Sequence, residues 1–184
     1  LINVYTAIRD NVEELIVDLK RHKNEKDYFY KIRAKDKDKD EYNKLSSIKK
    51  ASRIIYLNKT CYNGLFRVNQ QGEFNAPFGR YKNPNIVNEK VLRKASDFFN
   101  KGNIIFKCGD FEEAVKGIKM DDFVYFDPPY DPVSDSANFT GYDRGGFGKA
   151  EQERLKNLCD RLNKKGAKFL LSNSAPEFIV DLYK

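Results

Sequence analysis

The 184-residue sequence contains no tryptophan, one histidine, one methionine and three cysteines. Three widely spaced cysteines without a Cys-x-x-Cys pair argue against a disulfide framework, and a single histidine argues against a zinc site. No apolar run approaches the roughly 20 residues that span a bilayer. We therefore expect a soluble cytoplasmic protein with no membrane segment and no metal centre. None of these observations bears on the oligomeric state, for which we expect a monomer. We interpret the single histidine, His22, as a surface residue.

Positive charge and aromatic rings are plentiful. The chain has 34 Lys+Arg against 27 Asp+Glu, a net charge of +7, with 14 Phe and 11 Tyr. Between Lys20 and Lys59, 14 basic residues accompany 6 acidic ones, so this region alone exceeds the net charge of the chain. Localised basic charge is typical of proteins that bind nucleic acid. The alternating charges of residues 35–41 indicate a solvated turn or helix start, not a binding motif.

Apolar spacing predicts helices in the first part of the chain. Leu1 to Leu19 follow the spacing of one helix or of two helices in tandem, and Asp10 with Glu13 could cap the second. Similar patterns predict helices over residues 45–57 and 88–100, the latter ending at Gly102. Between them, two short apolar segments flank Asn69-Gln70-Gln71-Gly72, which predicts a hairpin.

The second part of the chain alternates short apolar runs with helical patterns. We expect strands at 104–106, 123–126 and 169–172, and helices at 111–115, 155–162 and 176–183. Such alternation with continuous apolar strands indicates an α/β fold with a parallel sheet covered on both faces.

Asp127-Pro128-Pro129-Tyr130 stands at the carboxyl end of the predicted strand 123–126. Ligands bind at this edge of open α/β sheets. Prolines offer carbonyls without a competing N–H, so Asp127 and the Pro128 carbonyl can form a fixed pair of acceptors for a planar amino group. Tyr130 offers a face for an aromatic ring to stack on. The alternative is a plain turn between strand and loop.

The motif resembles the catalytic motif of amino-methyltransferases that use S-adenosylmethionine. Residues 62–69 (YNGLFRVN) and 72–82 (GEFNAPFGRYK) closely resemble the hairpin of Dam-type DNA adenine methyltransferases, including the DpnII-type modification enzymes. The resemblance implies a Rossmann-like methyltransferase sheet with a helical and β-hairpin target-recognition insertion. It implies methylation of the exocyclic amino group of adenine in double-stranded DNA, in the sequence GATC. The adenine would be flipped out of the duplex to reach Asp127, Pro128 and Tyr130.

The resemblance also assigns residues to DNA and cofactor. In the hairpin, Arg67 is the candidate for reading guanine, with a phosphate contact as the alternative. Tyr62 and Asn63 would prop the duplex around the flipped base, Leu65 would pack on neighbouring bases and Pro77 could touch a thymine methyl. For Tyr62 and Leu65, the alternative is burial at the hairpin base. The residues that fit phosphate neutralisation are Arg80, Lys82, Arg53 and Lys59.

For the cofactor, Asp110 and Phe111 match an acidic-aromatic pair that contacts its adenine in the family. Asp127 is also assigned to the cofactor site. The alternative for Asp110 is an ordinary helix N-cap. Residues 132–148 form a Gly-rich stretch that we expect to be a mobile loop ordering with DNA and cofactor.

The sequence departs from the family at both ends. The Phe-x-Gly-x-Gly segment and the following acidic residue of the cofactor site are missing, and the last strands are not reached, so we expect roughly the central two-thirds of an enzyme whose sheet has about six strands. We assign 1–19 and 88–184 to an incomplete catalytic domain and 20–87 to the target-recognition insertion. Alternatives are a catalytically incompetent DNA-binding fragment, and methylation of RNA or protein by a relative, which the hairpin match argues against.

Overall fold

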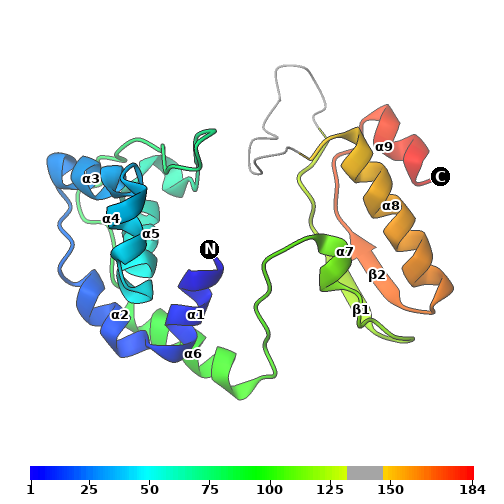
Figure 1. Cartoon of the computed structure of the whole chain (residues 1–184), viewed down its shortest axis with the longest axis horizontal. Coiled ribbons are helices and arrows are strands. Elements are labelled where there is room, and N and C mark those ends of the chain that lie inside the picture. Colours follow the sequence, from blue (N-terminus) through cyan, green and yellow to red (C-terminus); the bar gives the residue numbers. More distant parts are fainter. Residues whose placement is uncertain (132–146) are drawn as a thin grey trace. The chain divides into compact units, whose positions relative to one another are not determined.

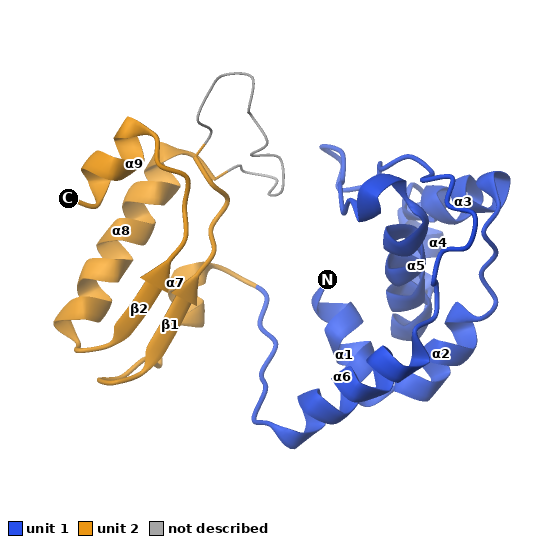
Figure 2. Ribbon diagram, turned by 180° about the vertical axis from the view of Figure 1, so that it is seen from behind, with its two compact units in different colours: residues 1–108 blue, residues 109–184 orange. Residues whose placement is uncertain are grey.

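The computed structural model describes residues 1–131 and 147–184. The predicted mobile loop over 132–148 lies almost entirely outside the described residues. The chain forms two compact units, residues 1–108 and 109–184, which we describe separately (Figure 2). The predicted division into residues 1–19, 20–87 and 88–184 stays a prediction.

Unit 1 is a group of helices around a central one. Its elements are α1 (Ile2–Asp10), α2 (Val12–Leu19), α3 (Lys26–Arg33), η1 (Ala34–Asp36), α4 (Lys39–Lys44), α5 (Ser47–Thr60), η2 (Tyr62–Gly64) and α6 (Glu89–Lys101) (Figure 1). Helices α1, α2 and α3 all pack against α5, and α1 also packs against α6. The Ser46 side chain caps α5 by accepting a hydrogen bond from the Lys49 N–H at 3.3 Å. The core includes fully buried Tyr56 and Leu57 on α5.

The predicted tandem helices are confirmed as α1 and α2, but the predicted cap is wrong. Asn11 is the N-cap residue of α2, and its side chain makes no capping hydrogen bond. Asp10 is instead the last residue of α1, where its carboxylate pairs with Arg9 at 2.7 Å. The Asp10 side chain is therefore bound to Arg9 and does not cap α2. The first turn of α2 carries the acidic residues Glu13 and Glu14, which are favourable at the N-terminus of a helix.

The predicted hairpin is confirmed as an antiparallel turn with little regular strand. Isolated antiparallel bridges join Val68 to Phe74 and Cys61 to Phe78. At the tip, the Asn69 N–H donates to the Glu73 carbonyl at 2.9 Å, and Gly72 has a φ of 77° that favours glycine. Phe74 is buried in the helical core, which anchors the hairpin to unit 1.

Residues 104–106 do not form the predicted strand. The segment is extended without a β partner, and Ile105 is exposed. The Phe106 ring stacks on Tyr5 of α1 at 5.4 Å and meets Phe99 of α6 edge-on at 5.0 Å. These aromatic contacts tie the segment to α1 and α6, downstream of Gly102, where α6 ends as predicted.

Unit 2 contains α7 (Phe111–Ala114), β1 (Phe123–Phe126), α8 (Lys149–Lys164), β2 (Lys168–Leu171) and α9 (Glu177–Leu182). Strands β1 and β2 pair in parallel, with Phe123 opposite Lys168 and Phe126 opposite Leu171. This pair fits the predicted α/β class. The full Rossmann-like sheet stays a prediction.

The two faces of the β1–β2 pair differ because side chains alternate along a strand. Val124, Phe126, Phe169 and Leu171 pack with Leu155, Leu158 and Leu162 of α8. Helix α8 runs along this face (Figure 2). On the opposite face, the side chains are exposed: Phe123 is 64% exposed, Tyr125 56% and Leu170 57%. Within the described parts of the chain, no helix is long and apolar enough to cross a membrane.

Candidate functional site

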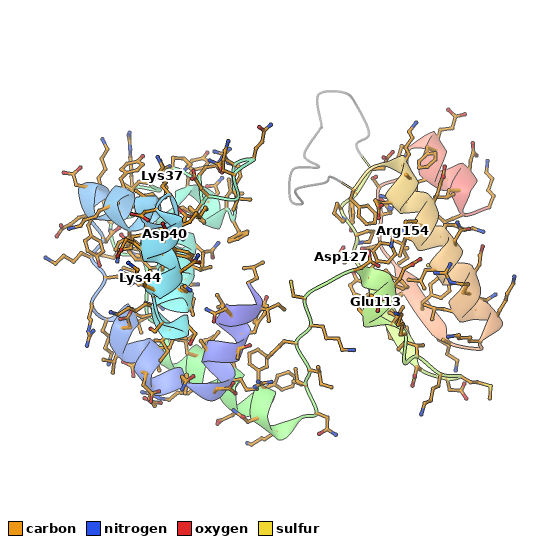
Figure 3. The ribbon with its side chains drawn as sticks, in the orientation of Figure 1. Lys37, Asp40, Lys44, Glu113, Asp127 and Arg154 are labelled. Atoms are coloured by element: carbon orange, nitrogen blue, oxygen red, sulfur yellow. The ribbon has the colours of Figure 1, made fainter. Side chains whose placement is uncertain are left out.

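The Asp127 carboxylate lies where β1 ends, as predicted (Figure 3). The Ser172 N–H donates to the Phe126 carbonyl at 3.0 Å, which continues the strand pairing to the edge of the sheet. The Ser172 hydroxyl then donates to Asp127 Oδ1 at 2.7 Å and accepts from the Tyr125 hydroxyl at 3.3 Å. One carboxylate oxygen is thus held, while no described residue donates a hydrogen bond to Oδ2. Exposed Asp127 can therefore accept a hydrogen bond from a ligand.

A hollow of about 260 Å³ adjoins the motif. Asp127, Pro128 and Pro129 line it together with Phe111 from α7 and apolar side chains that include Leu155 of α8. The structure therefore brings Phe111 and three of the four predicted catalytic residues to one pocket. Tyr130, 49% exposed, and Asp110 do not line this hollow.

Asp110 is the N-cap of α7, where its Oδ1 accepts from the Glu112 N–H at 2.9 Å. The capping alternative is therefore confirmed, and it leaves a cofactor contact open. Arg154 Nη2 donates to both carboxylate oxygens, at 3.0 and 2.9 Å, and the guanidinium lies 4.7 Å from the centre of the Phe111 ring. These hydrogen bonds, from Arg154 first and then from the backbone, lower the pKa of Asp110. Asp110 thus stays an ionised acceptor beside an aromatic ring.

Three polar residues of this site were missed from the sequence: Ser172, Asn173 and Gln152. The first two directly follow β2. Parallel strands end at the same edge of a sheet, so the sequence could have predicted that the polar residues after β2 lie near Asp127. Gln152 gave no such signal, because a glutamine in a helix of alternating polar and apolar residues is ordinarily exposed.

The hairpin residue Arg67 is exposed, as its predicted role requires. Its Nε donates to Asn75 Oδ1 at 2.8 Å and its Nη2 to the Asn75 carbonyl at 3.2 Å. Asn75 in turn donates its N–H to the Arg67 carbonyl at 2.9 Å. Asn75 thus braces the guanidinium across the hairpin, while Nη1 bonds to no residue in the described ranges.

The other predicted DNA-contacting residues cluster around η2. Tyr62, Asn63 and Pro77 are exposed, and the Tyr62 N–H donates to the Pro77 carbonyl at 2.8 Å. Asn63 adopts the left-handed region with a φ of 52°. Leu65 is half-buried against the core of unit 1, which favours packing at the hairpin base for this residue.

Gly79 holds the base of the hairpin close to α5. Its N–H donates to the Thr60 carbonyl at 2.8 Å, and a Cβ there would lie 2.6 Å from the Cys61 carbonyl oxygen. The following residue, Arg80, is exposed with a left-handed φ of 57°. Lys59 and Lys82 are also exposed, so the surroundings of the hairpin base carry three accessible cations.

Arg53 is not available for phosphate neutralisation, and this prediction is wrong. Its side chain is buried, at 2% exposure, and pairs with Asp36 at 2.8 Å. Its Nε and Nη2 donate to the carbonyls of Ile32 and Arg33 at 2.8 and 2.6 Å. Asp36 lies in the charged run expected to be solvated, yet it is buried and accepts from the Phe74 N–H at 2.8 Å. The pair joins α5, η1 and the hairpin from inside.

His22 is also wrongly assigned to the surface. Its ring stacks on Tyr56 with centroids 4.3 Å apart, and its two nitrogens bond to the Tyr28 and Ser52 hydroxyls at 3.0 Å each. Burial is the main cause that lowers the pKa of His22. This histidine is therefore part of the packing of α5. Among the described residues, no group of three or more His, Cys, Asp or Glu side chains could hold a metal ion.

Comparison with known proteins identifies the family. The family model for D12 class N6 adenine-specific DNA methyltransferases matches residues 1–184. A type II methyltransferase of Lactococcus lactis subsp. cremoris is 42% identical over all of this chain and 65% of its own length. A type II methyltransferase of Methanocaldococcus jannaschii is 40% identical over 92% of this chain and 61% of its own. A DNA adenine methylase of Serratia marcescens is 34% identical over all of this chain and 67% of its own.

The chain thus spans about three-fifths to two-thirds of the length of these three relatives. The match of the family model covers both the helical unit with the hairpin and the unit with the Asp127 motif. The chain belongs to the family of D12 class N6 adenine-specific DNA methyltransferases.

Proposed function

We propose that this protein transfers a methyl group from S-adenosylmethionine to the exocyclic amino nitrogen of adenine in double-stranded DNA, with GATC as its target. The observation that carries the proposal is the arrangement at the end of β1, where Asp127 and two prolines line one hollow with Phe111. Family membership supports adenine as the methylated base. The GATC target rests on the hairpin resemblance.

The residues at the end of β1 suit the orientation of a planar amine. Asp127 Oδ2 and the Pro128 carbonyl would accept its two hydrogens, and Tyr130 would stack on the base. When both hydrogens are so held, the nitrogen lone pair is less delocalised into the ring and becomes more nucleophilic. The nitrogen becomes acidic only as the methyl arrives, so Asp127 orients the amine and stabilises its developing charge instead of removing a proton beforehand.

An adenine in a stacked duplex cannot reach these acceptors, so it must leave the stack at a cost of a few kcal/mol. The exposed residues Tyr62 and Asn63, held near Pro77 by a backbone hydrogen bond, could fill the space that the base leaves. Arg67 would read guanine with its fork, and exposed Arg80, Lys59 and Lys82 would contact phosphates.

The residues present fit the adenine part of the cofactor. The Asp110 carboxylate, kept ionised by Arg154, could accept from the adenine amino group, and the Phe111 side chain offers an apolar face in the hollow. When bound, S-adenosylmethionine supplies an electrophilic sulfonium methyl group. Asp110 and Phe111 would therefore hold one reactant close to the residues that orient the other.

Transfer of tritium-labelled methyl groups tests the proposal directly. The purified chain is incubated with labelled S-adenosylmethionine and a duplex containing one GATC, or a duplex in which one base pair of that site is changed. Incorporation only into the GATC duplex supports the proposal, and equal incorporation into both contradicts the target sequence.

A second assay separates the catalytic reading from its alternative. Calorimetric titration with S-adenosylmethionine, alongside duplex binding, reports whether the cofactor binds at all. If the duplex binds but titration with S-adenosylmethionine gives no heat of binding and no methyl group is transferred, only the DNA-binding alternative remains.

A further inference from the structure

Gln152 is a buried amide in the middle of unit 2 that the proposed reaction does not use. It lies in the first turns of α8 and has 0% of its surface exposed. Its Nε2 donates to the Pro129 carbonyl at 3.0 Å, and its Oε1 accepts from Asn173 Nδ2 at 3.0 Å. Burying an amide is costly unless it is hydrogen-bonded, so both ends of this side chain are committed to these partners.

Asn173 continues the chain of hydrogen bonds. Its Oδ1 accepts from the Asp131 N–H at 3.3 Å and from the Ser174 N–H at 2.9 Å. The Ser174 hydroxyl also donates back to the Asp131 carbonyl. Two side-chain amides thus connect α8 with the loop that follows β1 and the loop that follows β2.

This network decides which carbonyl of the motif stays available. Pro128 and Pro129 have no N–H, so each contributes only a carbonyl. Gln152 occupies the Pro129 carbonyl, whereas no described residue donates to the Pro128 carbonyl. On the other side, Ser172 occupies one oxygen of Asp127. Of the Asp127 carboxylate and the two proline carbonyls, one carboxylate oxygen and one carbonyl are left, which together are the two acceptors that an amino group with two hydrogens needs.

We propose that Gln152, together with Asn173, is a positioning residue that holds the Pro129 carbonyl away from the substrate and so presents the Pro128 carbonyl to the amino group. The proposal rests on the proposed function, because it assigns a role within that reaction. Neither side chain touches the base. They act through the direction of the backbone between Asp127 and Asp131.

Loss of the hydrogen bond from Gln152 to the Pro129 carbonyl should lower the rate of methyl transfer more than the affinity for the substrates. Misplacing a reacting group by about 1 Å can cost around 100-fold in rate. Gln152→Met keeps the length of the side chain but removes both hydrogen bonds. We expect its kcat to fall about 10- to 100-fold, with the KM for the duplex and for S-adenosylmethionine within about twofold of the wild type, because the hairpin and the Asp110 region are unchanged. Asn157→Ala, an exposed residue on the same helix, is the matched control and should keep the wild-type kcat.

A spectroscopic signal follows the Pro129 carbonyl without any turnover. Pro129-Tyr130 is the only Pro-Tyr pair in the sequence. Labelling proline with carbonyl ¹³C and tyrosine with ¹⁵N therefore gives a single carbonyl-to-amide correlation in an NMR spectrum. Gln152→Met should move the carbonyl resonance of this signal upfield, as expected when a carbonyl loses a hydrogen bond, whereas Asn157→Ala should leave it in place.

The two measurements together decide the proposal. A shifted Pro129 signal with a lower kcat and unchanged KM supports it. A shifted signal with wild-type kcat overturns it, and so does an unshifted signal. If the wild type itself transfers no methyl group, the proposed function fails and the role of Gln152 fails with it, which the wild-type assay alone reveals.

If Gln152→Met does not fold, Asn173→Asp replaces it. The acceptor for the N–H groups of Asp131 and Ser174 stays, and the donor to Gln152 is lost. The same changes in kcat and in the Pro129 signal are expected, at smaller size.

Discussion

The two units use charged side chains in opposite ways. In unit 1, Arg53 and Asp36 form a buried ion pair that also bonds to three backbone groups. In unit 2, Arg154 and Asp110 form an ion pair that is open to solvent beside a hollow, and Asp127 is exposed. The same chemical groups hold a fold together in one unit and lie at the candidate ligand site in the other. Whether a charged pair serves stability or binding therefore depends on its burial more than on its residue types.

Their apolar residues differ as well. Phe29 and Tyr56 are fully buried in unit 1, whereas Phe123, Tyr125 and Leu170 of the β1–β2 pair are more than half exposed. We therefore expect substitutions of buried polar groups in unit 1 to lower stability, and substitutions at the sheet edge of unit 2 to lower activity at nearly constant stability. Four predictions test this contrast.

The largest effect is expected from Arg53→Ala. Removing one partner of a buried ion pair leaves the other charge unpaired, which costs about 3–5 kcal/mol of unfolding free energy. Urea denaturation measures the change. Lys59→Ala, an exposed residue on the same helix, should stay within about 0.5 kcal/mol of the wild type. An Arg53→Ala variant as stable as that control would contradict the structural role of the pair.

Asp127→Ala should have the converse phenotype. Loss of one fixed electrostatic partner of the reacting group is expected to lower kcat by about 100- to 1000-fold. The midpoint of thermal unfolding should hardly change, since Asp127 is exposed and bonds only to Ser172 among the described residues. Methyl transfer and a thermal melt of the same sample provide both values. Asp97→Ala, an exposed carboxylate on α6, serves as control.

Arg67→Ala should change which duplex is preferred. If Arg67 reads guanine, the discrimination against a duplex with that base pair replaced should fall by about 1–3 kcal/mol. Arg80→Ala should instead weaken binding to both duplexes alike and reduce the salt dependence. Affinities for the two duplexes, measured at two salt concentrations, distinguish these results. Asn75→Ala, which removes a side-chain brace of Arg67, should show the Arg67 effect at smaller size.

The smallest effect concerns pH. Burial lowers the pKa of His22 below its ordinary value, with Lys35 acting in the same direction and Asp18 opposing. The unfolded chain therefore takes up a proton as the pH falls through about 6.5, before the folded protein does, and stability is lost as the pH falls below that value. Unfolding free energies at pH 7.5 and 5.5 should differ more for the wild type than for His22→Gln. An equal difference would count against a His22 pKa that is lowered by partial burial.

Local patterns predicted much of this molecule. The spacing of apolar residues located α1, α2, α5 and α6, the strands at 123–126 and 169–172 and the hairpin turn within a few residues, because each depends on its own periodicity or turn residues. Helix α3 lies in a charged region and was not predicted. The position of Asp127 followed from the same reasoning, since the motif comes directly after the apolar run that forms β1.

What could not be predicted depends on contacts between distant segments. Arg53 and Asp36 are 17 positions apart, and each looks like a solvated residue in a charged region until α5 and η1 pack together. His22 is half-buried only because Tyr28 and Tyr56 pack against it. Residues 104–106 have the composition of a strand, but their aromatic side chain finds its partners on α1 and α6.

The parallel register of β1 and β2 also limits which changes of chain length the protein can tolerate. Side chains alternate along a strand, so one residue inserted between Phe123 and Phe126 would exchange the faces of all the side chains beyond it. Asp127 would then leave its partner Ser172, although no functional residue had been replaced. An insertion in the exposed turn before β1, near Gly117, could be absorbed there. Among natural variants of this region, length differences should accumulate in that turn and be absent from the four paired residues.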